Sequence, residues 1–87
     1  MERIYIMNAK GIKLTEIISG FLSEFDNYMQ IAADNNDKNL VKYISKDYHK
    51  MEIFYFKSKK EELTSDERNN IRLDFKHNSK LMGKYLN

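Results

Sequence analysis

The stretch LTEIISGFLSEFDNYMQIAAD, residues 14–34, carries the strongest structural signal in this chain. Its apolar residues recur every three or four positions, which places them on one stripe of an α-helix. The stripe consists of Leu14, Ile18, Phe21, Leu22, Phe25, Tyr28, Met29 and Ala32. The opposite face is polar and consists of Glu16, Ser23, Asn27, Gln30 and Asp34. We therefore expect an amphipathic helix of about 20 residues, capped by Thr15, with Phe21, Leu22 and Phe25 in the core.

The residues before this helix have the composition of a short β-hairpin. Arg3 to Met7 is rich in β-branched and aromatic side chains, which favour strands. Asn8 to Gly11 is typical of a tight turn in which the glycine supplies a positive φ, and Ile12 to Leu14 would form the returning strand. The sequence thus predicts an N-terminal hairpin.

A second helix is expected after the turn at residues 34–37, with Asp37 as its N-cap. Its buried positions would be Val41, Ile44, Tyr48 and Met51, flanked by Leu40. Continuing it further would send Ile53, Phe54 and Phe56 in three different directions. The segment Ile53 to Phe56 therefore reads as a strand, bounded by lysines on both sides.

The last expected helix begins at a capping box, with Thr64 as the cap and Glu67 three residues later. Its apolar residues are Ile71, Phe75, Met82, Tyr85 and Leu86. The predicted order is strand, strand, helix, helix, strand, helix, which makes a small α+β domain. An all-α bundle is the alternative.

Size and composition indicate one folded domain that spans residues 1–87. A hydrophobic fraction of 41% and an aromatic fraction of 13% are enough for a core. With no cysteine, disulfides and thiol chemistry are excluded. The longest apolar runs have only four residues, too short for a signal-peptide core or a membrane span, so a cytoplasmic location is expected.

Basic residues are concentrated in the second half of the chain. Residues 1–40 have four bases and six acids, for a net charge of −2, whereas residues 41–87 have eleven bases and seven acids, for +4. Nine of the fifteen bases follow two ladders with a spacing of four. The first ladder is Lys38, Lys42, Lys46 and Lys50, and the second ladder is Arg68, Arg72, Lys76, Lys80 and Lys84. A spacing of four puts each ladder along a ridge of a helix.

The ladders point to an anionic partner, because like charges at this spacing destabilise a helix by roughly 0.2–0.5 kcal/mol per pair. No residue three or four positions from any base of the second ladder is acidic. A ridge of about 24 Å could neutralise several phosphates of a nucleic-acid backbone. Asn69 and Leu73 project on the same side and could touch bases or sugars. A solvated face that only keeps the domain soluble is the competing interpretation.

Tyr43 lies between Lys42 and Lys46 in the first ladder, off the buried stripe. Aromatic rings beside cations often stack on unpaired bases. Such a tyrosine could also cover the flank of the core or pack on another helix. Motifs of the common nucleic-acid-binding families are absent.

The sequence contains no set of residues that is typical of a catalytic site, and no cofactor site. His49 and His77 are the only histidines, and we expect both on the surface. His49 and Glu52 could supply two metal ligands at most, short of a site. Asp34 to Asn39 resembles the start of a calcium loop, but Lys38 and Ser45 stand where ligands belong.

The leading hypothesis is a small non-enzymatic binding protein with a regulatory or inhibitory role, whose ladders bind nucleic acid or a nucleoprotein complex. Lys, Asn, Ile and Tyr supply 36 residues, a bias common in small proteins of phages and mobile elements of low-G/C bacteria. One alternative is a protein-directed inhibitor that docks on an acidic surface of a host enzyme. Another is a structural homodimer in which the acidic face of the first helix meets a neighbour's basic ladder.

Overall fold

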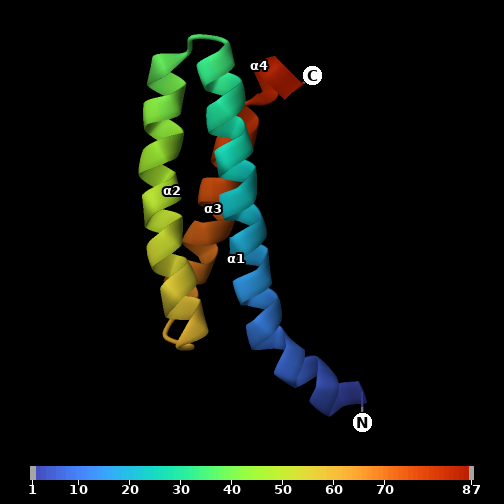
Figure 1. The fold of residues 1–87 in the computed structure, drawn as a ribbon. Helices are drawn as coiled ribbons and strands as arrows, with labels where there is room; N and C mark the ends of the chain where they lie inside the picture. The colour runs from blue at the N-terminus through green and yellow to red at the C-terminus, as the bar shows by residue number, and fades with distance from the viewer. Residues whose placement is uncertain (1, 87) are drawn as a thin grey trace.

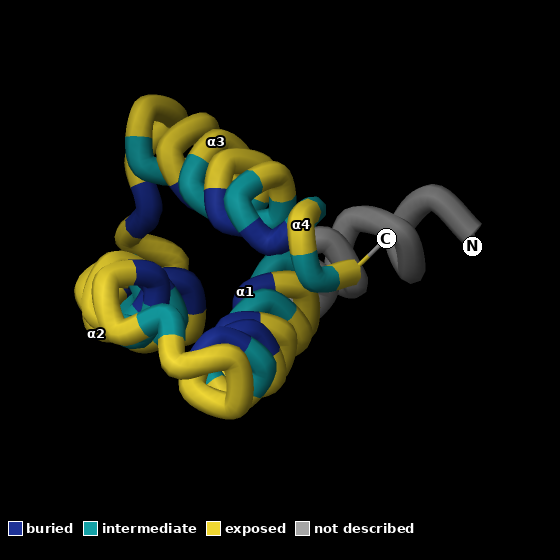
Figure 2. The backbone as a smooth tube through the Cα atoms, turned by 90° about the horizontal axis from the view of Figure 1, so that it is seen from above, coloured by how far each residue is buried: buried dark blue, intermediate teal, exposed yellow. Residues whose placement is uncertain are grey.

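The computed structural model describes the backbone of residues 2–86 and the side chains of residues 14–86, and the regular structure within this part of the chain is all helical. The helices are α1 (Glu2–Asp34), α2 (Lys38–Lys59), α3 (Ser65–Leu81) and the short α4 (Gly83–Leu86). In Figure 1, α1 and α2 form an antiparallel hairpin, and α3 runs back alongside both. The view along the helices in Figure 2 shows α1, α2 and α3 at the corners of a triangle.

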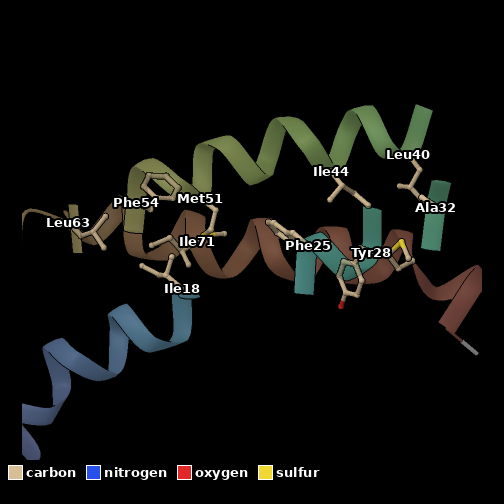
Figure 3. Close-up of a cluster of buried hydrophobic side chains, with 11 residues drawn as sticks. Ile18, Phe25, Tyr28, Ala32, Leu40, Ile44, Met51, Phe54, Leu63 and Ile71 are labelled. Carbon is tan, nitrogen blue, oxygen red and sulfur yellow. The ribbon is translucent and has the colours of Figure 1, made fainter. Parts of the chain in front are cut away.

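The core fills the space between these three helices (Figure 3). Its buried apolar residues are Ile18, Phe25, Tyr28, Ala32, Leu40, Ile44, Met51, Phe54, Leu63, Ile71 and Met82. The predicted stripe of residues 14–32 is confirmed, because all its members are buried or packed against this core. Phe25 is fully buried, while Phe21 and Leu22 are half-buried at the edge. Phe75 of α3 stacks on Phe21 with ring centroids 3.9 Å apart and on Phe25 at 5.9 Å.

Two predicted helix starts are confirmed by local hydrogen bonds. Asp37 caps α2, and its Oδ1 accepts from the backbone N–H of Leu40 at 3.3 Å. Thr64 and Glu67 form the capping box of α3: Oγ1 of Thr64 accepts from the N–H of Glu67 at 3.1 Å, and Oε1 of Glu67 accepts from the N–H of Thr64 at 3.0 Å. Each cap satisfies backbone donors that have no partner within the helix.

The predicted N-terminal hairpin is wrong, because α1 is one helix from Glu2 to Asp34. Strand preference in a short run is a weak effect of about 1 kcal/mol, and an isolated two-stranded hairpin is only marginally stable. Extending an existing helix gains one hydrogen bond for each residue that is fixed. Thr15 is therefore not an N-cap, and its Oγ1 instead lies 3.0 Å from Oγ of Ser58 in α2.

The predicted strand at Ile53 to Phe56 is also wrong, since α2 continues to Lys59. The α+β class is thereby corrected to an all-α domain. In this continued helix Ile53, Phe54 and Phe56 do point in three different directions, and of these three side chains only Phe54 points into the core. Ile53 and Phe56 point outward and are 58% and 60% exposed. Continuing the helix buries Met51 and Phe54, and the same helix leaves the apolar side chains of Ile53 and Phe56 exposed to solvent.

The end of the chain differs slightly from the expected helix. Ile71 and Met82 are buried and Phe75 and Tyr85 are half-buried, but Leu86 is 48% exposed, so its predicted burial is wrong. The reason is that α3 ends at Leu81 and the chain re-enters a separate turn of helix at Gly83. Among the described residues, no helix is apolar over a length that could cross a membrane.

Candidate nucleic-acid interface

The first ladder lies along α2, and all four of its lysines are exposed. Each step of four residues turns about 40° around the helix axis, so the ladder winds slowly. Lys42 and Lys46 lie opposite the buried Ile44, on the outer face. Lys50 has turned toward α3, where its Nζ lies 2.9 Å from Oδ2 of Asp74. That hydrogen bond raises the pKa of Lys50, so Lys50 is charged but already paired within the protein.

The second ladder is divided between two helices. Arg68, Arg72, Lys76 and Lys80 lie on α3 and are exposed, and they span about 18 Å. Lys76 and Lys80 project from the side opposite the buried Ile71. The predicted ridge of five bases does not continue to its last member, because Lys84 belongs to α4.

Lys84 is paired with the N-cap of α2. Its Nζ lies 2.9 Å from Oδ2 of Asp37, and the same carboxylate oxygen accepts a 2.7 Å hydrogen bond from the hydroxyl of Tyr85. The hydrogen bond with Asp37 raises the pKa of Lys84, and the hydrogen bonds from Lys84 and then Tyr85 lower the pKa of Asp37. Lys84 therefore attaches α4 to the start of α2 and is a weak candidate for a partner contact.

Seven ladder bases remain without an ion pair among the side chains of residues 14–86. They are Lys38, Lys42, Lys46, Arg68, Arg72, Lys76 and Lys80. Asn69 and Leu73 are exposed on the outer face of α3, and Leu73 is 62% exposed. Of the acids on α3, Glu67 pairs with Lys57 and Asp74 with Lys50. The outer face of α3 beyond its first turn is therefore cationic or neutral.

The two ladders lie on neighbouring helices (Figure 2), but a seam of polar contacts separates them. Asn78 of α3 is fully buried, and its Nδ2 donates to Oδ2 of Asp47 in α2 at 2.7 Å and to the carbonyl oxygen of Asp74 at 2.8 Å. Lys50 and Asp74 make the second contact of the seam. The acidic groups between the ladders are thus engaged by partners within the protein.

Tyr43 of α2 contacts a residue of α3 across this seam. Tyr43 is 43% exposed, and its ring lies against the ring of His77 in α3, with the centroids 5.7 Å apart and the planes inclined by 52°. One of the open alternatives, packing on another helix, is what Tyr43 does. The contact between His77 and Tyr43 was not predicted, because no local sequence pattern pairs residues so far apart in the chain. Asn78 was also missed, although it lies seven residues after Ile71 and so on the buried stripe.

The remaining chemical groups form no larger cluster within the described part of the chain. His49 is exposed, and its Nδ1 lies 3.0 Å from Oε1 of Glu52. Among residues 14–86, no group of three or more histidine or acidic side chains could hold a metal ion.

Comparison of the chain with known protein families, with curated proteins and with solved structures finds no match. The function is therefore inferred from the surface chemistry of the helices.

Proposed function

We propose that this protein is a non-enzymatic nucleic-acid-binding protein. The exposed lysine and arginine side chains on α2 and α3 that make no ion pair among residues 14–86 would hold the phosphates. The observation that carries the proposal is the series Arg68, Arg72, Lys76 and Lys80, which is exposed along α3 without an ion pair among residues 14–86. A series of like charges is unfavourable in the free protein. Bound phosphates would remove that repulsion.

The dimensions of α3 suit a phosphate backbone. Its four bases span about 18 Å, and a duplex carries one charge for each ~1.7 Å of its axis. Asn69 and Leu73 lie on the outward side and would then meet base edges or sugars. Lys42 and Lys46 of α2 would extend the positive surface to the neighbouring helix.

The biological role that we propose is regulation or inhibition, in a phage or mobile-element setting. The small size of the domain and the compositional bias of the sequence support this setting. The partner would be nucleic acid itself or a nucleoprotein complex that displays it.

Exposed Leu73 favours a second candidate, an inhibitor that docks on an acidic surface of a host enzyme. This apolar side chain is 62% exposed among the bases of α3. Protein interfaces often have an apolar centre within a polar rim. A homodimer is a third possibility, because exposed acids of α1, among them Glu16, Glu24 and Asp34, could meet a neighbour's bases.

Binding of purified protein to nucleic acid over a salt series tests the proposal. A fluorescein-labelled strand, alone and annealed to its complement, would be titrated with protein between 50 and 200 mM salt while anisotropy is recorded. Four phosphate contacts predict a log–log slope of about −3.6 for a duplex and about −2.8 for a single strand. A folded protein that binds neither form at 50 mM salt would contradict the proposal. Sedimentation of the free protein would reveal a homodimer.

A further inference from the structure

The seam between α2 and α3 carries two exposed rings in contact, Tyr43 and His77. They are contributed by different helices, yet each has the same sequence setting. Tyr43 has Lys42 before it and Lys46 one turn later, and His77 has Lys76 before it and Lys80 one turn later.

All four of these lysines are exposed and make no ion pair among residues 14–86. They lie on the outer faces of their helices, on either side of the seam. The ring pair therefore has lysines without an ion pair among residues 14–86 next to it in sequence on each of the two helices.

The two acids at the seam are engaged by partners within the protein. Asp47 accepts a hydrogen bond from the buried Asn78, and Asp74 is paired with Lys50. These contacts join α2 to α3 close to the rings, since Asp47 lies one turn after Tyr43 and Asn78 directly follows His77. The helices that carry the two rings are therefore joined to each other next to the ring pair.

We propose that the bound nucleic acid is single-stranded and that one of its bases stacks on the Tyr43–His77 pair, while the flanking lysines hold the adjacent phosphates. This inference rests on the proposed function. Exposed aromatic rings among unpaired cations are the combination by which proteins hold unpaired bases. A duplex keeps the faces of its bases inside the stack and presents only edges and phosphates, so the rings would be unused.

The affinity of one labelled strand of 12 nucleotides, alone and annealed to its complement, tests this inference in wild type and three variants. We expect the wild type to bind the single strand at least several-fold more tightly than the duplex. Tyr43→Leu, which removes the ring but keeps an apolar side chain, should weaken strand binding on the order of tenfold. Its salt slope should stay unchanged, because the phosphate contacts remain. Tyr43→Phe keeps the ring and should bind within about twofold of the wild type.

Phe56→Leu is the matched control, because Phe56 is an aromatic residue on the same helix and is 60% exposed. It should leave binding unchanged. A strand with 2-aminopurine at its centre supplies a second readout, since stacking on the rings should quench its emission in the wild type and not in Tyr43→Leu.

Equal strand affinity of Tyr43→Leu and wild type would overturn the inference, as would tighter binding of the duplex. In both cases the proposed nucleic-acid binding would stand. Failure of the wild type to bind either form would overturn both.

Discussion

The side-chain amide of Asn78 in α3 donates a 2.7 Å hydrogen bond to Oδ2 of Asp47 in α2. Asn78 is fully buried, and its Oδ1 has no hydrogen-bond partner among the described residues. A single buried asparagine can fix the register of paired helices, because any other register leaves it without partners. Here that register places Tyr43 beside His77 and the two ladders on adjacent helices.

Replacing Asn78 with alanine should destabilise the domain by about 1–3 kcal/mol, because Asp47 loses a donor in a partly buried site. Urea unfolding followed by circular dichroism measures this effect. The double variant Asn78→Leu with Asp47→Leu should recover much of the loss, since both polar partners are then removed. Stability unchanged in Asn78→Ala would mean that the hydrogen bond does not hold the two helices.

Phe25→Ala should cost about 3–5 kcal/mol, because it removes a fully buried ring from the centre of the core. A small domain has only ~5 kcal/mol or so to lose, so this variant should be largely unfolded. Phe56→Ala, at an exposed position, should change stability by less than about 0.5 kcal/mol. If both variants melted at the wild-type temperature, the position of the core would be wrong.

Acid should weaken the attachment of α4 to α2. The pKa of Asp37 is lowered below its ordinary value of 3.8, chiefly by the hydrogen bond from Lys84. A lowered folded-state pKa contributes stability that is present above the unfolded value and is lost as pH falls through the folded value. Between pH 5 and strongly acidic solution, Asp37→Asn should therefore lose less stability than the wild type.

Chemical unfolding at a series of pH values checks this prediction for Asp37. Glu24→Gln is the control, because Glu24 is exposed and makes no ion pair among the described residues. An identical pH profile for Asp37→Asn and wild type would show that the contacts of Asp37 are not maintained in solution.

Local signals in the sequence predicted the parts of the fold that local chemistry determines. The stripe of α1 and the caps at Asp37 and Thr64 depend on residues within a few positions of each other. The helical structure of the segment from Ile53 to Phe56 could not be predicted from such local signals. Its helix leaves Ile53 and Phe56 exposed, and the burial of Phe54 that favours this helix depends on packing against the other helices.

The candidate site shows the same division. Exposure of the ladder bases follows from their spacing on a helix. The pairing of Lys50 with Asp74 and of Lys84 with Asp37 does not, because each pair joins separate helices. The contact of Tyr43 with His77 likewise depends on the packing of α2 against α3.

Charge reversal on α3 is the most direct test of the claim that the lysine and arginine side chains of this helix hold nucleic acid. Lys76→Glu with Lys80→Glu would be compared with Lys59→Glu with Lys60→Glu, which changes the net charge equally at the end of α2. Lys59 and Lys60 are exposed and belong to neither ladder. Circular dichroism would verify that both variants are folded.

The measurement is binding of labelled nucleic acid over a salt series near 150 mM, where distant charges are screened beyond about 8 Å. We predict that reversal of Lys76 and Lys80 abolishes tight binding and reduces the log–log salt slope by about 1.4–1.8 units. The variant with Lys59 and Lys60 reversed should bind much as the wild type does. Equal loss in both variants would mean that only net charge matters, and unchanged binding by the folded Lys76→Glu, Lys80→Glu variant would show that the bases of α3 are merely a solvated face.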